Sequence, residues 1–190
     1  MKITDFTFSK LVLIPIGNKG HFKLADDLHI TVNAPGGKGW RFILRKDFVT
    51  YLGSVPNVIS GFIPKYGDQD LTVTYVLHDA FYTRVGLAYG VAQHLVKRDF
   101  ADKLLRAMLT FCDECTQYQI NILKETNKTA SKEDKKHNDA RIKALKGELL
   151  GSAKTYAIYK AVDWFGRSAY EGIDKPPCDQ NYNKISMEVL

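Results

Sequence analysis

Short apolar runs, several of them alternating with polar residues, fill the first 50 positions and predict β-strands. These runs cover residues 11–16, 21–24, 28–32 and 40–45, and turn-forming clusters at 17–20 and 33–39 separate them. Because short strands at this spacing pair with their neighbours, we expect an antiparallel meander with one buried face. His21 and His29 fall in these strands, where we interpret them as ordinary sheet residues.

After residue 69 the apolar residues recur every three or four positions, which predicts helices. The first helix is expected to begin near Asp70 and the second near Asp99, each aspartate being a candidate N-cap. The connection between the two is short, so we expect an antiparallel hairpin in which Asp102 faces the first helix. A third helix is predicted within 140–170, and its pattern stops at Gly166.

These patterns indicate a single α+β domain, with an N-terminal antiparallel β-sheet packed on a C-terminal bundle of three main helices. A chain of 190 residues is long enough for one such domain and its core. Its expected parts are a β-rich part (1–50), a loop (51–69), a helix hairpin (70–123), a charged insertion (124–139), the third helix (140–170) and a tail (171–190). The insertion has almost no apolar residues, so it is a solvated loop, an exposed helix extension or a disordered segment.

The composition is that of an ordinary globular protein with a basic balance. Hydrophobic residues make up 45% and charged residues 25%, and the net charge is +6. This charge favours anionic partners such as a lipid surface, although much of it is concentrated between Lys124 and Lys146. The sequence contains no nucleic-acid recognition motif, no secretory signal and no apolar run long enough for a spanning helix, so we expect a cytoplasmic protein.

Cys112 and Cys115 have C-x-x-C spacing, and Cys178 lies far from them. A structural zinc site would need a second such pair, and a thioredoxin-like motif would need a strand before it. We therefore predict two thiols that face the core.

The candidate chemistry lies on the first helix. At 100° per residue, Tyr75, His78, Asp79 and Tyr82 fall within about 100° of one another, opposite an apolar face. The His78 imidazole is a candidate general base, Asp79 a candidate cation ligand, and Asp102 could orient the imidazole while Tyr82 hydrogen-bonds that carboxylate. The alternative is that these groups form a buried polar network that only holds the helices together.

Several motifs in register resemble a small phage and prophage family known only as a domain of unknown function. They are Phe48 to Pro56, Val76 to Tyr82, Arg98 to Asp102 and Tyr156 to Gly166. The first motif usually reads Thr-Asp-x-x-Ser-x-Pro in that family, and here Tyr51 stands at the aspartate. The resemblance implies a protein of the host cytoplasm or the virion, with phage or host proteins as partners.

The His-Asp-x-x-Tyr spacing, with an aspartate on an antiparallel helix, also resembles secreted phospholipases A that cleave the sn-2 ester. That resemblance implies that His78 activates water and that Asp102 orients the imidazole of His78. It also implies that Asp79 binds calcium together with the upstream loop, which contains Ser54. Tyr51 stands where an acidic calcium ligand is expected, so the sequence lacks that ligand of the site. A metal-dependent phosphohydrolase of the His…His-Asp…Asp type ranks lower, since it needs a further histidine on an upstream helix.

Two functions follow from these observations. The first is a hydrolase that cleaves an ester or phosphoryl bond with His78 as the base. The second is a non-catalytic phage protein, either a virion or tail component or a factor that binds a host or defence target.

Overall fold

The computed structural model describes most of the chain. The described residues are 1–16, 21–50, 69–82, 97–171 and 185–190. Tyr51 and Ser54 lie outside them. Six of the strands lie in the N-terminal part: β1 (Asp5–Phe8), β2 (Leu13–Ile16), β3 (His21–Leu24), β4 (Leu28–Ala34), β5 (Lys38–Leu44) and β6 (Val49–Thr50). The helices α1 (Gln69–Tyr82), α2 (Arg98–Thr126), α3 (Lys132–Glu148) and α4 (Gly151–Glu171) follow, and β7 (Ile185–Val189) comes last.

The strands form two antiparallel sheets, whereas the sequence predicted one meander. One sheet has the order β1-β4-β5-β7 and the other the order β2-β3-β6. The expectation of an antiparallel, N-terminal β part is confirmed, and with it the α+β class. Strand β7 lies within the predicted tail, where no strand was expected, and Met187 pairs with Phe42 at the edge of the first sheet.

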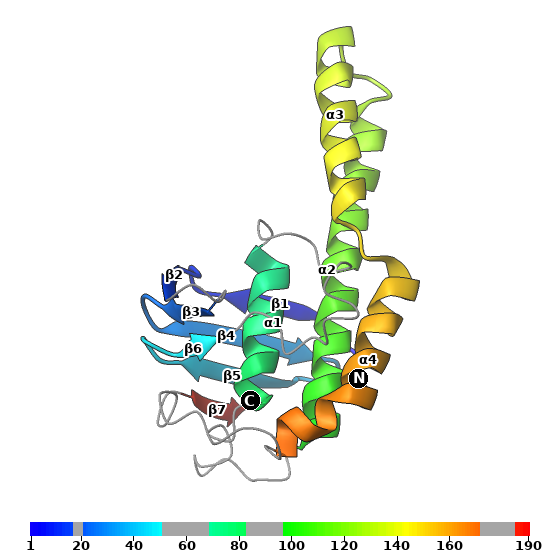
Figure 1. Cartoon of the computed structure of the whole chain (residues 1–190). Coiled ribbons are helices and arrows are strands. Elements are labelled where there is room, and N and C mark those ends of the chain that lie inside the picture. Colours follow the sequence, from blue (N-terminus) through cyan, green and yellow to red (C-terminus); the bar gives the residue numbers. More distant parts are fainter. Residues whose placement is uncertain (17–20, 51–68, 83–96, 172–184) are drawn as a thin grey trace.

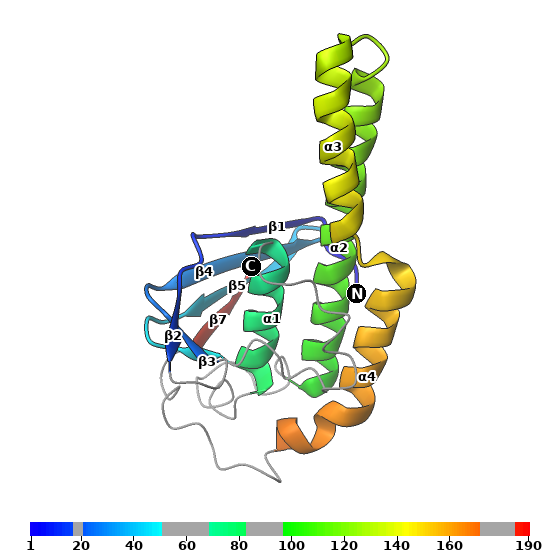
Figure 2. The same ribbon diagram turned by 45° about the horizontal axis from the view of Figure 1, so that its top comes forward.

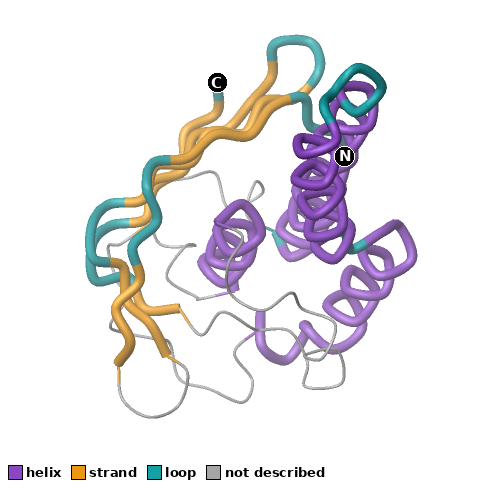
Figure 3. Tube along the Cα trace, turned by 90° about the horizontal axis from the view of Figure 1, so that it is seen from above, coloured by secondary structure: helices purple, strands orange, loops and turns teal. Residues whose placement is uncertain are grey.

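Helix α1 lies between the first sheet and the other helices (Figure 3). Alternate residues of β4 and β5 point toward it, and the ring of Phe42 meets that of Phe81 edge-on at 5.4 Å between centroids. On its other side α1 packs against α2. Every residue from Val73 to Tyr82 is therefore buried, and the side of α1 predicted to be polar is covered by other parts of the chain and does not face solvent.

Helices α2 and α3 form an arm that projects beyond the sheet (Figures 1 and 2). The 29-residue α2 passes out of the core, a short turn follows, and α3 returns along it. The Ser131 hydroxyl accepts a hydrogen bond from the backbone N–H of Asp134 at 3.2 Å and caps α3. The predicted charged insertion is thus mainly helical, which agrees with the alternative of an exposed helix extension.

The prediction of one continuous third helix is wrong. The chain leaves the helical conformation at Leu149, and Gly151 adopts a φ of +73°. The Asp113 carboxylate of α2 accepts the backbone N–H groups of Leu150 and Gly151, each at 2.8 Å, and so caps the start of α4. This cap comes from a distant part of the chain, so the periodicity of the sequence does not predict it.

Gly166 does not end α4, which continues to Glu171. A Cβ atom at Gly166 would lie 2.6 Å from the hydroxyl oxygen of Tyr82. The glycine therefore permits close approach of α4 to α1, a common reason for a glycine within a helical pattern.

Candidate functional site

The antiparallel packing of α1 and α2 brings His78 and Asp102 together. Nε2 of His78 lies 3.1 Å from Oδ1 of Asp102, although 24 residues separate the two in sequence. His78 is 3% exposed and Asp102 2% exposed. The predicted partnership between these two residues is present, in a buried setting.

Tyr82 completes this cluster from one turn further along α1. Its hydroxyl donates to the same Asp102 oxygen at 2.5 Å, and its ring lies against the imidazole with 4.3 Å between centroids. A carboxylate oxygen that receives a phenol hydrogen bond is well suited to accept a second one from the Nε2–H of His78. In that tautomer the lone pair of a neutral imidazole is on Nδ1, which is the atom able to accept a proton.

Asp79 lies beside this cluster and has a different partner. The hydroxyl of Thr50, at the end of β6, donates to Oδ2 of Asp79 at 2.7 Å, and both residues are buried. The contact joins the second sheet to α1. Thr50 falls at the end of the predicted β-rich part, and its pairing with Asp79 across 29 residues has no sequence signal.

Asp79 is the predicted calcium ligand on α1. Calcium takes six to eight oxygen ligands, commonly including several carboxylates. No group of three or more His, Cys, Asp or Glu side chains suited to a metal occurs in the part of the chain that the structure describes. Asp79 contributes one carboxylate there, and Ser54 and Tyr51 fall outside that part, so we assign no calcium-dependent step.

Tyr75 does not join the cluster, in contrast to the helical-wheel grouping. Its hydroxyl is buried and has no hydrogen-bond partner among the described residues. Burial raises the pKa of this phenol, and the nearby Cys112 and Asp113 raise it further. Tyr75 is therefore a neutral core residue that contacts the middle of α2.

Other titratable candidates have separate roles. Asp99, the predicted N-cap of the second helix, lies in the first turn of α2 and forms an exposed ion pair with Lys103 at 2.7 Å. Cys112 is buried and Cys115 is half-buried, and neither forms a disulfide within the described residues, which agrees with the prediction of core-facing cysteines. Burial raises the pKa of Cys115, with smaller contributions from nearby carboxylates, so this thiol is less reactive than an ordinary one.

The arrangement permits two chemical roles. A histidine oriented through Nε2 by a carboxylate, with Nδ1 able to accept a proton, is the arrangement of a general base. The same hydrogen bonds, buried between two helices, would also fix the packing of those helices.

Comparison with known proteins finds one family model, described as a protein of unknown function (DUF1353), which matches residues 23–117. The match spans half of the chain and runs from β3 into α2, so it includes His78, Asp79, Tyr82 and Asp102. No curated protein and no solved structure matches the chain. None of the described helices is long and apolar enough to cross a membrane.

Proposed function

The chain belongs to the family of proteins of unknown function called DUF1353, and we propose that it is a hydrolase that uses His78 as a general base on water. The observation that carries this proposal is the contact between Nε2 of His78 and Oδ1 of Asp102 at 3.1 Å. The substrate class is an ester, either of a carboxylic acid or of a phosphoryl group. The spacing shared with secreted phospholipases A supports the carboxylic ester.

In the proposed reaction, Nδ1 of His78 takes a proton from a water molecule. At the same time the oxygen of that water forms a bond to the carbonyl carbon or the phosphorus atom of the ester. The bond to the alkoxide then breaks, and the alkoxide receives that proton from His78 and leaves as an alcohol. Asp102 stabilises the imidazolium that exists between these two steps, and Tyr82 holds the carboxylate in place. General-base catalysis of this kind contributes roughly 10²- to 10⁴-fold in rate.

A non-catalytic phage protein is the second candidate, and the burial of the cluster favours it. His78 and Asp79 are each 3% exposed, so the hydrogen bonds could serve only to hold α1 between β6 and α2. This candidate includes a virion or tail component and a factor that binds a host protein. It predicts that the cluster matters for stability and not for turnover.

The test uses 4-nitrophenyl butyrate and bis(4-nitrophenyl) phosphate as probes, with wild type and His78→Gln. Glutamine can still donate a hydrogen bond to Asp102 but cannot accept the proton of water, so we expect the fold to be kept and the rate to fall at least 10²-fold. His29→Gln is the matched control, because His29 is exposed on β4. It should leave the rate unchanged.

Asp102→Asn provides a second measurement. If the amide donates to Nε2, the imidazole proton moves to Nδ1 and the base is lost while the shape of the side chain is kept. Asp102→Asn should therefore lower the rate, as His78→Gln does. Hydrolysis of neither probe by the wild type, or an unchanged rate in His78→Gln, would contradict the enzyme proposal.

A further inference from the structure

A pocket lies on the face of α2 that is turned away from α1. The segment before β1, helix α2 and helix α4 enclose a cavity of about 380 Å³, near the lower end of the range for small-molecule sites (about 300–1,000 Å³). Lys103, Arg106, Thr110 and Glu114 line it from α2 at intervals of three or four residues. They form an exposed stripe, whereas Asp102 is buried toward α1.

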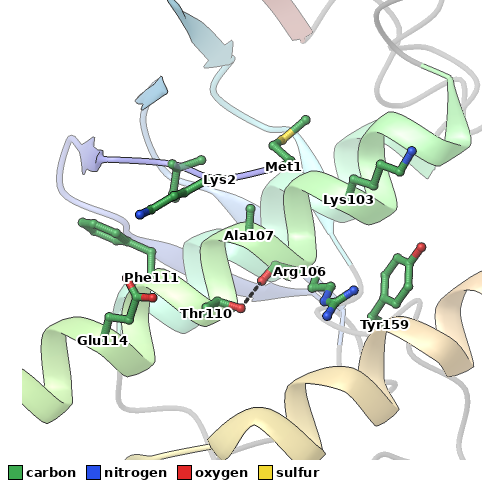
Figure 4. A pocket seen from close by; sticks show the side chains of 10 residues that line it. Met1, Lys2, Lys103, Arg106, Ala107, Thr110, Phe111, Glu114 and Tyr159 are labelled. Carbon is green, nitrogen blue, oxygen red and sulfur yellow. Dashed lines mark hydrogen bonds between the residues drawn. The ribbon is translucent and has the colours of Figure 1, made fainter. Parts of the chain in front are cut away.

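The charge of this pocket is positive. Lys2, Lys103 and Arg106 supply three cations and Glu114 one carboxylate, which leaves a net of +2 on the lining side chains. Figure 4 shows Lys103 and Arg106 on the side of Tyr159, with Lys2 on the opposite wall. Neither Lys2 nor Arg106 forms an ion pair within the described residues, while Lys103 is paired with Asp99.

Two tyrosines of α4 hold the guanidinium of Arg106. Its central carbon lies 5.4 Å from the ring centroid of Tyr156 and 5.2 Å from that of Tyr159. Cation–π contact of this kind orients the planar guanidinium without neutralising its charge. A pre-oriented guanidinium without an ion-pair partner matches the oxygens of a phosphate, which it can bind through two parallel hydrogen bonds.

The remaining walls are apolar or aromatic. Ile3, Ala107, Phe111 and Tyr159 line the cavity beside the cations. Inorganic phosphate would leave these walls uncovered, whereas a phosphate that carries an apolar or aromatic group would cover them. We propose that this pocket binds a small organic phosphate dianion, with Arg106 on the phosphate and the organic group against the apolar wall of the pocket.

The test is a calorimetric titration of the full chain with phenylphosphonate, a dianion near pH 8 whose C–P bond resists hydrolysis at the His78 site. We expect one site per chain. Arg106→Gln should weaken binding at least tenfold, since it removes the charge and the forked donor. Arg141→Gln is the matched control, because Arg141 is exposed on α3 and lies outside the pocket, and its affinity should equal that of the wild type.

Inorganic phosphate and phenol separate the contributions of the two ends of the ligand. Each should bind at least tenfold more weakly than phenylphosphonate. No binding of phenylphosphonate at 10 mM, or equal affinity in Arg106→Gln and the wild type, would overturn the site. Equal affinity for inorganic phosphate and phenylphosphonate would overturn the assignment of an organic ligand. His78→Gln should bind phenylphosphonate like the wild type, which keeps this result separate from the hydrolase test.

Discussion

Gly166→Ala tests whether the close approach of α4 to α1 holds the candidate site in place. The added Cβ would lie 2.6 Å from the hydroxyl oxygen of Tyr82, 2.9 Å from Cε1 and 3.2 Å from Cζ. Ordinary contact begins at 3.4 Å, so Tyr82 or α4 must move by about 0.8 Å. Tyr82 is 7% exposed and is hydrogen-bonded to Asp102, so it has little room to move.

The expected cost follows from two opposing effects. Overpacking a buried site costs about 1–3 kcal/mol, and alanine in place of glycine within a helix returns about 0.5–1 kcal/mol. We therefore expect Gly166→Ala to lower the free energy of unfolding by about 1–2 kcal/mol. For a chain of this length that corresponds to a decrease in Tm of roughly 2–8 °C.

Urea denaturation followed by circular dichroism measures this change, with Gly147→Ala as the matched control. A Cβ at Gly147, in α3, meets nothing within 4 Å, so that substitution should stabilise the helix. In a Tyr82→Phe background the nearest atom is absent, and Gly166→Ala should cost less than in the wild type. Equal effects of the two glycine substitutions, or no coupling to Tyr82→Phe, would refute the argument.

Three further predictions concern parts of the fold outside the site. The backbone N–H of Lys46 and the Arg45 guanidinium lower the pKa of Asp27, so its contribution to stability is present above its unfolded pKa of about 3.9 and is lost as pH falls through its folded pKa. Asp27→Asn should thus be less stable than the wild type in urea at pH 7, and the difference should shrink at pH 3. Asp113→Ala removes the cap of α4 and should cost about 0.5–2 kcal/mol in the same assay; a smaller loss would contradict the capping role. Ser131→Ala should speed amide exchange in α3 and leave exchange in β4 and β5 unchanged, because its cap acts only on the arm.

The main chemistry of the hairpin could be predicted because it depends on local periodicity. His78, Asp79 and Tyr82 share one side of α1 through the helical repeat, and the short connection to α2 implied an antiparallel partner. The sequence therefore predicts Asp102 as the partner of His78. The α+β class followed in the same way, from the change of apolar period near residue 69.

The failures occur where contacts between distant residues outweigh local pattern. Apolar residues at helical spacing continue through Leu149, but the Asp113 carboxylate caps a new helix there and divides the predicted third helix in two. Tyr75 shares a helical side with His78, yet it packs against a different part of α2 and has no place in the cluster. Helical spacing places a side chain on a face, and tertiary packing decides what that face meets.

The sequence by itself determined the fold class, the main helices of the core and the residue types able to act as base and orienting acid. Tertiary structure alone decided that the cluster is buried and that Thr50 donates a hydrogen bond to Asp79. It also decided that Arg106 faces a separate pocket between α2 and α4. The physical reason is the distance along the chain over which each interaction acts. Backbone period and capping act over a few residues, whereas burial, hydrogen-bond pairing and cavity shape depend on groups that only the folded chain brings together.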